Sequence, residues 1–377
     1  MPKSVQSLPI LLAIAAAALP ITASAQQSGA DSEHAVFVMT NAPDQNEVIA
    51  YERMPSGALR EAHRFQTGGR GSGGNNDPLE SQGSLTLSQD HSLLFAVNAG
   101  SGEISVFRVD GSRLTFADKV SSSGSEPNAI AQHADLVYVV NTGGSSNVIG
   151  FHLEGDHLKQ ISRSPAFLST NTSGAASIAI SPDGQFLAVT ERLTNNIDVF
   201  RVLPDGTLSA IAISPSVGPG AFSVSFEPGG AAIVSETGPA SVANGSAVSS
   251  YEIRPDGTLS PISSSVPTLG AANCWNAITP DGHFVYISNA GSSTISGFAV
   301  GAGGTLTALP GTIIAANPSG ATNLDITVSS DGQFLYTLNS RNGTISIFAI
   351  QKDGTLKSAG VAGGVSPNAG FNGIAAD

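Results

Sequence analysis

The sequence is poor in cysteine and in charged residues. Cys274 is the only cysteine, so no intramolecular disulfide can form, and stability must come from strand pairing and core packing. Charged residues make up only 12% of the chain, and the formal net charge is −13. Because an acidic protein repels phosphate groups, nucleic acids and anionic membrane surfaces are not expected partners.

Long apolar runs are missing beyond the N-terminus. The one such run, Leu8 to Leu19, follows Lys3 and precedes the small-x-small pattern Ala23-Ser24-Ala25. These features predict a secretory signal peptide over residues 1–25, a linker over 26–33 and a mature domain over 34–377. The run is too short to span a bilayer. We therefore expect a monomer in the periplasm or outside the cell, with no membrane span.

The sequence also lacks the usual patterns of metal and nucleophile sites. Its histidines fall at turns and in outer strands or at a strand start, so neither a zinc site nor a Ser-His-Asp triad is expected. The run from Gly69 to Gly74 matches G-x-G-x-x-G, but no helical period follows it. It therefore predicts a flexible loop rather than a dinucleotide site. No metal or other cofactor is expected.

What the sequence does contain is a repeat of about fifty residues. One phrase is a turn followed by a strand, as in Ser181-Pro-Asp-Gly-Gln-Phe-Leu-Ala-Val. A second phrase is an alternating strand that ends in Asp-Gly-Thr-Leu, and its leucine recurs as Leu59, Leu114, Leu158, Leu208, Leu259, Leu306 and Leu356. Asp-Gly between alternating apolar runs indicates tight hairpins, because glycine accepts the positive φ that such turns need.

Each copy of the repeat predicts four short strands, A to D. In the fourth copy these are residues 176–181, 186–190 and 197–202, with strand D beginning near Leu208. Seven such copies predict an all-β fold, a seven-bladed β-propeller, and disfavour a long β-sandwich. The first copy starts at strand B, Ala35–Asn41, and the chain ends in a segment like strand A. We therefore expect the C-terminal strand to complete the first blade and close the ring.

The end of strand B supplies the candidate catalytic residues. It is asparagine in five copies, namely Asn41, Asn98, Asn141, Asn289 and Asn339, which favours a turn-capping role. In two neighbouring copies it is Glu191 and Glu236, and Arg192 follows the first. Two carboxylates beside an arginine suit acid/base chemistry on an anionic substrate, the alternative being a surface salt bridge. We predict that these three face one pocket opposite the Asp-Gly turns, on what we call the top face.

Further polar residues are expected on the same face. The predicted substrate-binding residues are Asn98, Trp275, Asn276, Asn289, Arg341 and Arg70. Trp275 is the only tryptophan and should lie near the central tunnel, where it either stacks on a ligand ring or fills the core. Cys274 is a nucleophile or an inert buried thiol, and the absence of a nearby histidine favours the second.

Together the repeat phrases, the sevenfold count and Glu191-Arg192 resemble the bacterial seven-bladed propeller lactonase family. That family includes propeller-type 6-phosphogluconolactonases and carboxymuconate lactonising enzymes, and the resemblance covers about Ala35 to Asp377. It implies metal-independent opening or closing of the lactone of a small polyhydroxy or carboxylic acid. Unlike the lactonising enzymes, this sequence places no histidine on the top face. The alternative is a non-catalytic envelope propeller, similar to the YVTN type, that binds a sugar-like ligand or a partner.

Overall fold

The structure, a computed structural model, describes residues 1–4, 34–239 and 241–377. Residues 1–4 form no regular secondary structure. The rest of the predicted signal peptide, with its cleavage pattern, lies outside the described residues. Within the described part of the chain, no helix is long and apolar enough to cross a membrane.

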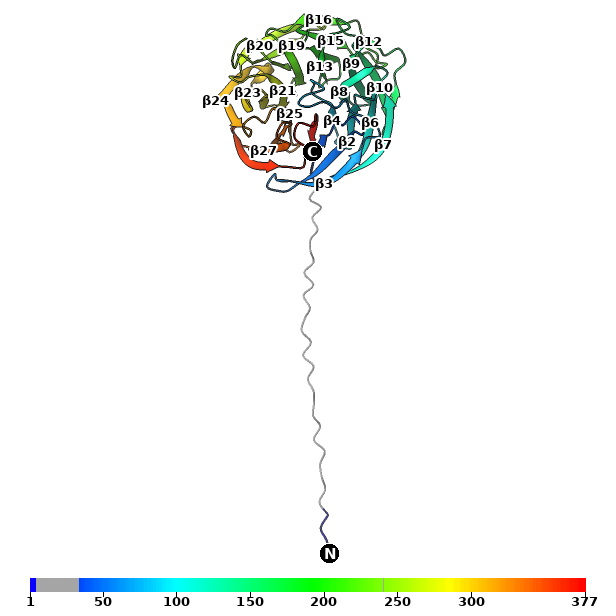
Figure 1. The fold of residues 1–377 in the computed structure, drawn as a ribbon, viewed down its shortest axis with the longest axis vertical. Coiled ribbons are helices and arrows are strands. Elements are labelled where there is room, and N and C mark those ends of the chain that lie inside the picture. Colours follow the sequence, from blue (N-terminus) through cyan, green and yellow to red (C-terminus); the bar gives the residue numbers. More distant parts are fainter. Residues whose placement is uncertain (5–33, 240) are drawn as a thin grey trace. The chain divides into compact units, whose positions relative to one another are not determined.

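Seven antiparallel sheets surround a common centre as the blades of a propeller (Figure 1), which confirms the predicted fold. Six blades have four strands, and blade 3 has an additional one. In blade order the strands are β29 (Ile374–Ala376), β1 (Ala35–Met39), β2 (Glu47–Arg53), β3 (Leu59–Gln66); β4 (Leu85–Leu87), β5 (Leu93–Asn98), β6 (Glu103–Asp110), β7 (Arg113–Ser121); β8 (Ser125–His133), β9 (Leu136–Gly143), β10 (Asn147–Glu154), β11 (His157–Gln160), β12 (Ala166–Phe167); β13 (Ala175–Ile180), β14 (Phe186–Glu191), β15 (Asn196–Arg201), β16 (Ala212–Pro215); β17 (Ala221–Phe226), β18 (Ala232–Glu236), β19 (Ala247–Ile253), β20 (Leu259–Pro267); β21 (Asn273–Ile278), β22 (Phe284–Asn289), β23 (Thr294–Val300), β24 (Leu306–Ala316); and β25 (Asn323–Val328), β26 (Phe334–Asn339), β27 (Thr344–Ile350), β28 (Leu356–Ala362).

The C-terminal strand closes the ring as predicted. β29 pairs antiparallel with β1, with Ile374 opposite Val38, and becomes the innermost strand of blade 1. All three of its residues are buried. Blade 1 is therefore built from both ends of the chain, so its stability depends on residues far apart in the sequence.

The largest error in a predicted strand boundary is in blade 4, and the other boundaries given differ by one or two residues, as where β1 ends at Met39 rather than Asn41. Strand D of blade 4 was expected near Leu208, but β16 begins at Ala212. Leu208 makes only an isolated bridge with Val202. The amide of Ser209 donates to the carbonyl of Arg201, and its hydroxyl accepts from the Arg201 amide, so the hairpin continues beyond Leu208 without forming regular strand.

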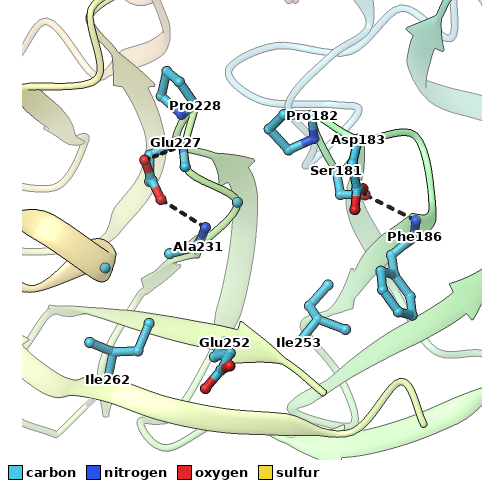
Figure 2. A pocket seen from close by; sticks show the side chains of 13 residues that line it. Ser181, Pro182, Asp183, Phe186, Glu227, Pro228, Ala231, Glu252, Ile253 and Ile262 are labelled. Carbon is cyan, nitrogen blue, oxygen red and sulfur yellow. Dashed lines mark hydrogen bonds between the residues drawn. The ribbon is translucent and has the colours of Figure 1, made fainter. Parts of the chain in front are cut away.

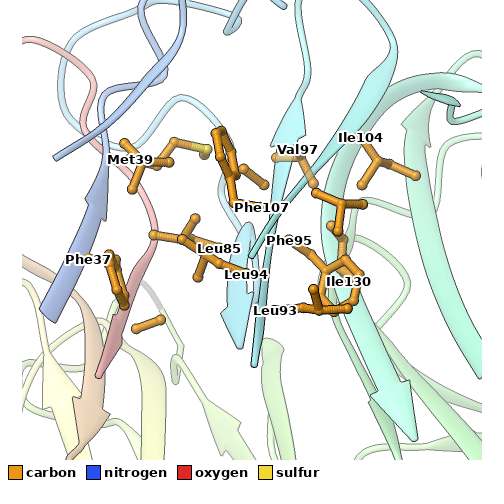
Figure 3. Close-up of a cluster of buried hydrophobic side chains, with 14 of the residues drawn as sticks. Phe37, Met39, Leu85, Leu93, Leu94, Phe95, Val97, Ile104, Phe107 and Ile130 are labelled. Carbon is orange, nitrogen blue, oxygen red and sulfur yellow. The ribbon is translucent and has the colours of Figure 1, made fainter. Parts of the chain in front are cut away.

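The core lies between the blades, because alternating strand residues face the neighbouring blade on either side. Figure 3 shows this for blades 1 and 2, where Phe37, Phe95 and Phe107 pack with shorter apolar side chains. No disulfide contributes to this packing, since the only cysteine is free.

A segment of the loop between β3 and β4 crosses the centre of the ring. We call Leu79–Gly83 the plug. Ser81 donates its hydroxyl to the carbonyl of Asn128 in blade 3 and accepts from the indole of Trp275 in blade 6. The backbone amide of Gln82 donates to the carbonyl of Ala176 in blade 4, and its side-chain amide donates to the carbonyl of Asn276 in blade 6. The plug thus ties three blades together.

Candidate functional site

Asparagines at the ends of strand B join strands within a blade. In blades 2, 6 and 7 the asparagine donates to a serine hydroxyl on strand C. These bonds are Asn98 to Ser105 at 2.8 Å, Asn289 to Ser296 at 2.9 Å and Asn339 to Ser346 at 2.8 Å. Asn98 and Asn289 are fully buried, which places these two predicted substrate-binding residues in structural hydrogen bonds.

Glu191 occupies the same position in blade 4 and is also fully buried. It accepts hydrogen bonds from the Ser169 amide at 2.9 Å and from the hydroxyls of Ser169 and Thr194. Asp198 on strand C faces it. Burial, the hydrogen bond to Glu191 and the charge of Glu191 raise the pKa of Asp198 to about 8. Burial opposes ionisation of Glu191, but its hydrogen bonds outweigh burial and lower its pKa.

Glu236, the equivalent residue of blade 5, has a different and complete set of donors. One carboxylate oxygen accepts from the Gly218 amide at 2.8 Å and from the hydroxyls of Ser216 and Ser249, and the other accepts from Ser265. It shares no hydrogen-bond partner with Glu191. The two glutamates are therefore separate interblade groups, and the prediction that they face one pocket is not met, because strand B ends against the neighbouring blade rather than the tunnel.

Glycine makes room for these buried side chains. A Cβ on Gly218 would lie 2.1 Å from a carboxylate oxygen of Glu236. Since that carboxylate is fixed by its donors, Gly218→Ala should lower the free energy of unfolding by about 2–3 kcal/mol, as overpacking does. Chemical denaturation would measure this loss. Gly363→Ala is the control, because its Cβ would meet nothing within 4 Å, and an equal loss in both variants would contradict the prediction.

Arg192 lies apart from Glu191, in what we call the central cluster: Asp77, Glu80, Arg192 and Cys274. Arg192 follows strand B, Cys274 is the second residue of strand A, and the two acids come from the loop that forms the plug, so all four belong to the top face. Arg192 forms an ion pair with Glu80. Asp77 accepts from the Glu80 amide at 3.0 Å and from the Asn372 side chain at 2.8 Å.

Burial and neighbouring charges shift the pKa values of this cluster. Burial raises the pKa of Asp77 to about 7, against the hydrogen bond from Asn372 and the positive charge of Arg192. Burial also raises the pKa of the Cys274 thiol, with Asp77 adding to the effect. Cys274 keeps partial exposure although protein surrounds it, and no histidine is present to activate it. A carboxyl group that titrates near neutral pH beside an arginine is suited to acid/base chemistry.

A second acid lies close by on β25 and is buried. Asp325 accepts from the amides of Ile326 at 2.9 Å and Ile374 at 3.2 Å, and burial, with the charge of Asp77 adding, raises its pKa to about 7. Neither Asp77 nor Asp325 was predicted from the sequence. The available signal was Asp325 itself, an acid inside the apolar strand Asn323–Val328.

Asp325 should make stability depend on pH. Its folded pKa exceeds its unfolded value, so its contribution is full below about pH 4 and is lost as pH rises through about 7. We expect the wild-type free energy of unfolding to fall between pH 5 and 7, with Asp325 supplying about 1 kcal/mol per pH unit. Denaturation at each pH would show a smaller slope for Asp325→Asn. The exposed-residue variant Asp44→Asn should keep the wild-type slope, and identical slopes in all three proteins would contradict the prediction.

The remaining predicted residues have mixed positions. Trp275 is 1% exposed, packs edge-on against Phe222 and holds the plug, so it fills the core rather than presenting a stacking surface. Asn276 is also buried and holds the plug. Arg70 and Arg341 are exposed on top loops. The structure therefore brings Arg192 together with Asp77, Glu80 and Cys274, rather than with the other predicted site residues.

A well-formed cavity lies on the bottom face, away from this cluster. It measures about 730 Å³ and lies between blades 4 and 5 (Figure 2). Its buried acid, Glu227, accepts from the amides of Gly229 and Ala231 and so caps its own turn. Among the described residues, no group of three or more His, Cys, Asp or Glu side chains could hold a metal ion. We therefore take the central cluster as the candidate site.

Comparison with known proteins supports a single family. The family described as "Lactonase, 7-bladed beta-propeller" matches residues 36–159 and 137–274. No curated protein matches the sequence. Among solved structures, periplasmic gluconolactonase from Pseudomonas aeruginosa is 18% identical, with a TM-score of 0.67 over 92% of this chain and 99% of that one. A candidate 6-phosphogluconolactonase from Bacteroides uniformis is also 18% identical, with a TM-score of 0.66 over 92% and 100%.

Proposed function

Because this chain belongs to the seven-bladed β-propeller lactonase family, we propose that it opens or closes the lactone of a small polyhydroxy or carboxylic acid at the central cluster. The observation that carries the proposal is the position of Asp77, whose pKa of about 7 is set by burial beside Arg192. In this cluster one group can transfer protons at neutral pH and another can bind an anion.

The residues of the cluster suggest a sequence of steps for hydrolysis. Ionised Asp77 takes a proton from water as the water oxygen bonds to the lactone carbonyl carbon. Arg192 exchanges Glu80 for the substrate and stabilises the oxyanion of the tetrahedral intermediate. The bond between that carbon and the ring oxygen then breaks, and protonated Asp77 returns its proton to the ring oxygen. Ring closure is the reverse of these steps.

Glu191 and Glu236 take supporting roles in this proposal. Glu191 is the last residue of β14, directly before Arg192. Its hydrogen bonds to Ser169 and Thr194 fix the point from which the arginine leaves the strand. We infer that it positions Arg192, whereas Glu236 stabilises the contact between blades 4 and 5. Neither is exposed enough to touch a substrate.

We also propose that the protein acts after export, in the periplasm or outside the cell. The support is the N-terminal pattern of Lys3, an apolar run and Ala23-Ser24-Ala25. N-terminal sequencing of the protein from fractionated cells tests this, and a product that retains Met1 in the cytosol would contradict it.

Turnover of a panel of aldono- and carboxylactones tests the proposed reaction. We expect hydrolysis of at least one class, with uptake of base followed at constant pH and with no added metal. The panel should include a phosphorylated lactone, because the family includes 6-phosphogluconolactonases. If a well-folded preparation hydrolyses none of them above background, the alternative of a binding propeller is favoured, and the bottom cavity becomes its candidate site.

A further inference from the structure

Blade 4 differs from the other blades in the chemistry at the end of strand B. In blades 2, 6 and 7 an asparagine donor meets a serine hydroxyl on strand C. In blade 5 the carboxylate of Glu236 meets the hydroxyl of Ser249 at 2.7 Å and further donors. In blade 4 alone of these five, an acid faces another acid, Glu191 and Asp198. An ionised carboxylate can only accept hydrogen bonds. Blade 4 therefore has two acceptors facing each other, where each of the other four blades has a donor and an acceptor.

The protein groups around this pair leave it short of positive charge. The Ser169 amide is shared between the two carboxylates, at 2.9 Å from Glu191 and 3.1 Å from Asp198. The hydroxyls of Ser169 and Thr194 both donate to one oxygen of Glu191. The second oxygen of Asp198 is fully buried and has no partner among the described residues. The nearest arginine in sequence, Arg192, is paired with Glu80 instead.

We propose that Glu191 and Asp198 form a site for one calcium ion between blades 3 and 4. Two carboxylates and the hydroxyls of Ser169 and Thr194 offer six oxygen atoms, and Ca²⁺ takes six to eight oxygen ligands in flexible geometry. The unpartnered oxygen of Asp198 is the acceptor that such an ion would satisfy.

The position of the site suits a structural ion. Ser169 belongs to the loop that connects blade 3 to blade 4, whereas Glu191 and Asp198 belong to adjacent strands of blade 4. A cation bonded to both therefore joins two blades. Ser169 and Thr194 are only half-buried, which leaves a route for the ion from the top face. Burying two carboxylates without a counter-charge is costly, so occupancy should stabilise the ring.

Thermal unfolding of the full protein tests this proposal. After EDTA treatment and removal of the chelator, 1 mM CaCl₂ should raise the Tm by several degrees, and calorimetry should show one ion bound. Asp198→Ser should abolish both responses, because it introduces the neutral serine that blades 2, 6 and 7 use and so keeps the protein folded. Glu236→Gln is the matched control, since it alters the equivalent acid of blade 5, and it should retain the full calcium response.

Three outcomes would overturn the proposal. The first is no calcium-dependent shift in the wild-type protein, which would mean that a shared proton alone neutralises the pair. The second is an equal shift in Asp198→Ser, which would place the ion elsewhere. The third is an equal response to MgCl₂ or KCl, which would indicate a general salt effect. Lactone turnover enters none of these readouts, so this test fails or succeeds separately from the proposed function.

Discussion

Deletion of Phe371–Asp377 should prevent the ring from folding or lower its Tm by tens of degrees. The deletion removes β29 and with it the antiparallel pairing to β1. Phe371, Ile374 and the two alanines after it are 4–7% exposed, and their loss would open the core of blade 1. Burial of a large apolar side chain such as Phe371 or Ile374 contributes about 1.5–3 kcal/mol to the free energy of unfolding. The total loss therefore approaches the whole stability of a typical domain.

The deletion has a second cost at the ring centre. Asp325 loses the amide of Ile374, and the half-buried Asp77 loses the side chain of Asn372, so two acids are left short of donors. Circular dichroism and calorimetry of the truncated protein would measure the effect. Ser366→Ala, in the exposed loop before β29, is the control and should melt like the wild type. A truncated protein with an unchanged transition would show that β29 does not close the ring.

Asp77→Asn should lower kcat for a lactone substrate by about 10²–10⁴-fold, the usual effect of removing a general base. The amide oxygen can still accept from Glu80 and Asn372, so the fold should persist. In the wild type, kcat/KM should rise with pH through about 7, because only ionised Asp77 accepts a proton. That rise should disappear from the residual activity of Asp77→Asn.

Two further variants make this result specific. Asp44→Asn, an exposed acid on a loop of the same face, should keep wild-type kcat. Arg192→Ala should raise KM and also lower kcat, because the guanidinium is assigned both to substrate binding and to the oxyanion. Full activity in Asp77→Asn, with the pH profile retained, would show that Asp77 is not the general base. Another acid of the ring would then have to take that role.

The fold was predictable because its signal is repeated seven times. A misplaced boundary in one copy, such as that of β16, leaves the count of blades unchanged. Ring closure was also predictable, since the first copy lacks strand A and the last residues supply one. Each of these inferences depends on local alternation of apolar residues, which the chain encodes directly.

The site was harder to predict because it depends on which side chains reach the ring centre. The acids Glu191 and Glu236 stand out in the repeat, but their side chains turn toward neighbouring blades. Asp77 lies in an irregular loop with no periodic pattern, so nothing in the sequence assigns it to the ring centre. Arg192 was selected for its position beside Glu191, although its ion-pair partner, Glu80, comes from another blade's loop.

The plug has a consequence for how the protein reaches its native state during synthesis. Trp275, whose indole donates to Ser81, comes 194 residues later in the sequence. The plug therefore cannot bond blade 6 until more than half of the chain has been made. Contacts between residues so far apart in the sequence form late, and they lower the rate of folding. Early blades can pair their own strands as they emerge, and the plug can bond blades 3 and 4 next. The contact of the plug with blade 6 and the pairing of β29 with β1 must form later. We therefore expect the indole N–H of Trp275 to gain protection from hydrogen exchange together with the amides of β29, and after the amide of Gln82, which donates to Ala176 of blade 4.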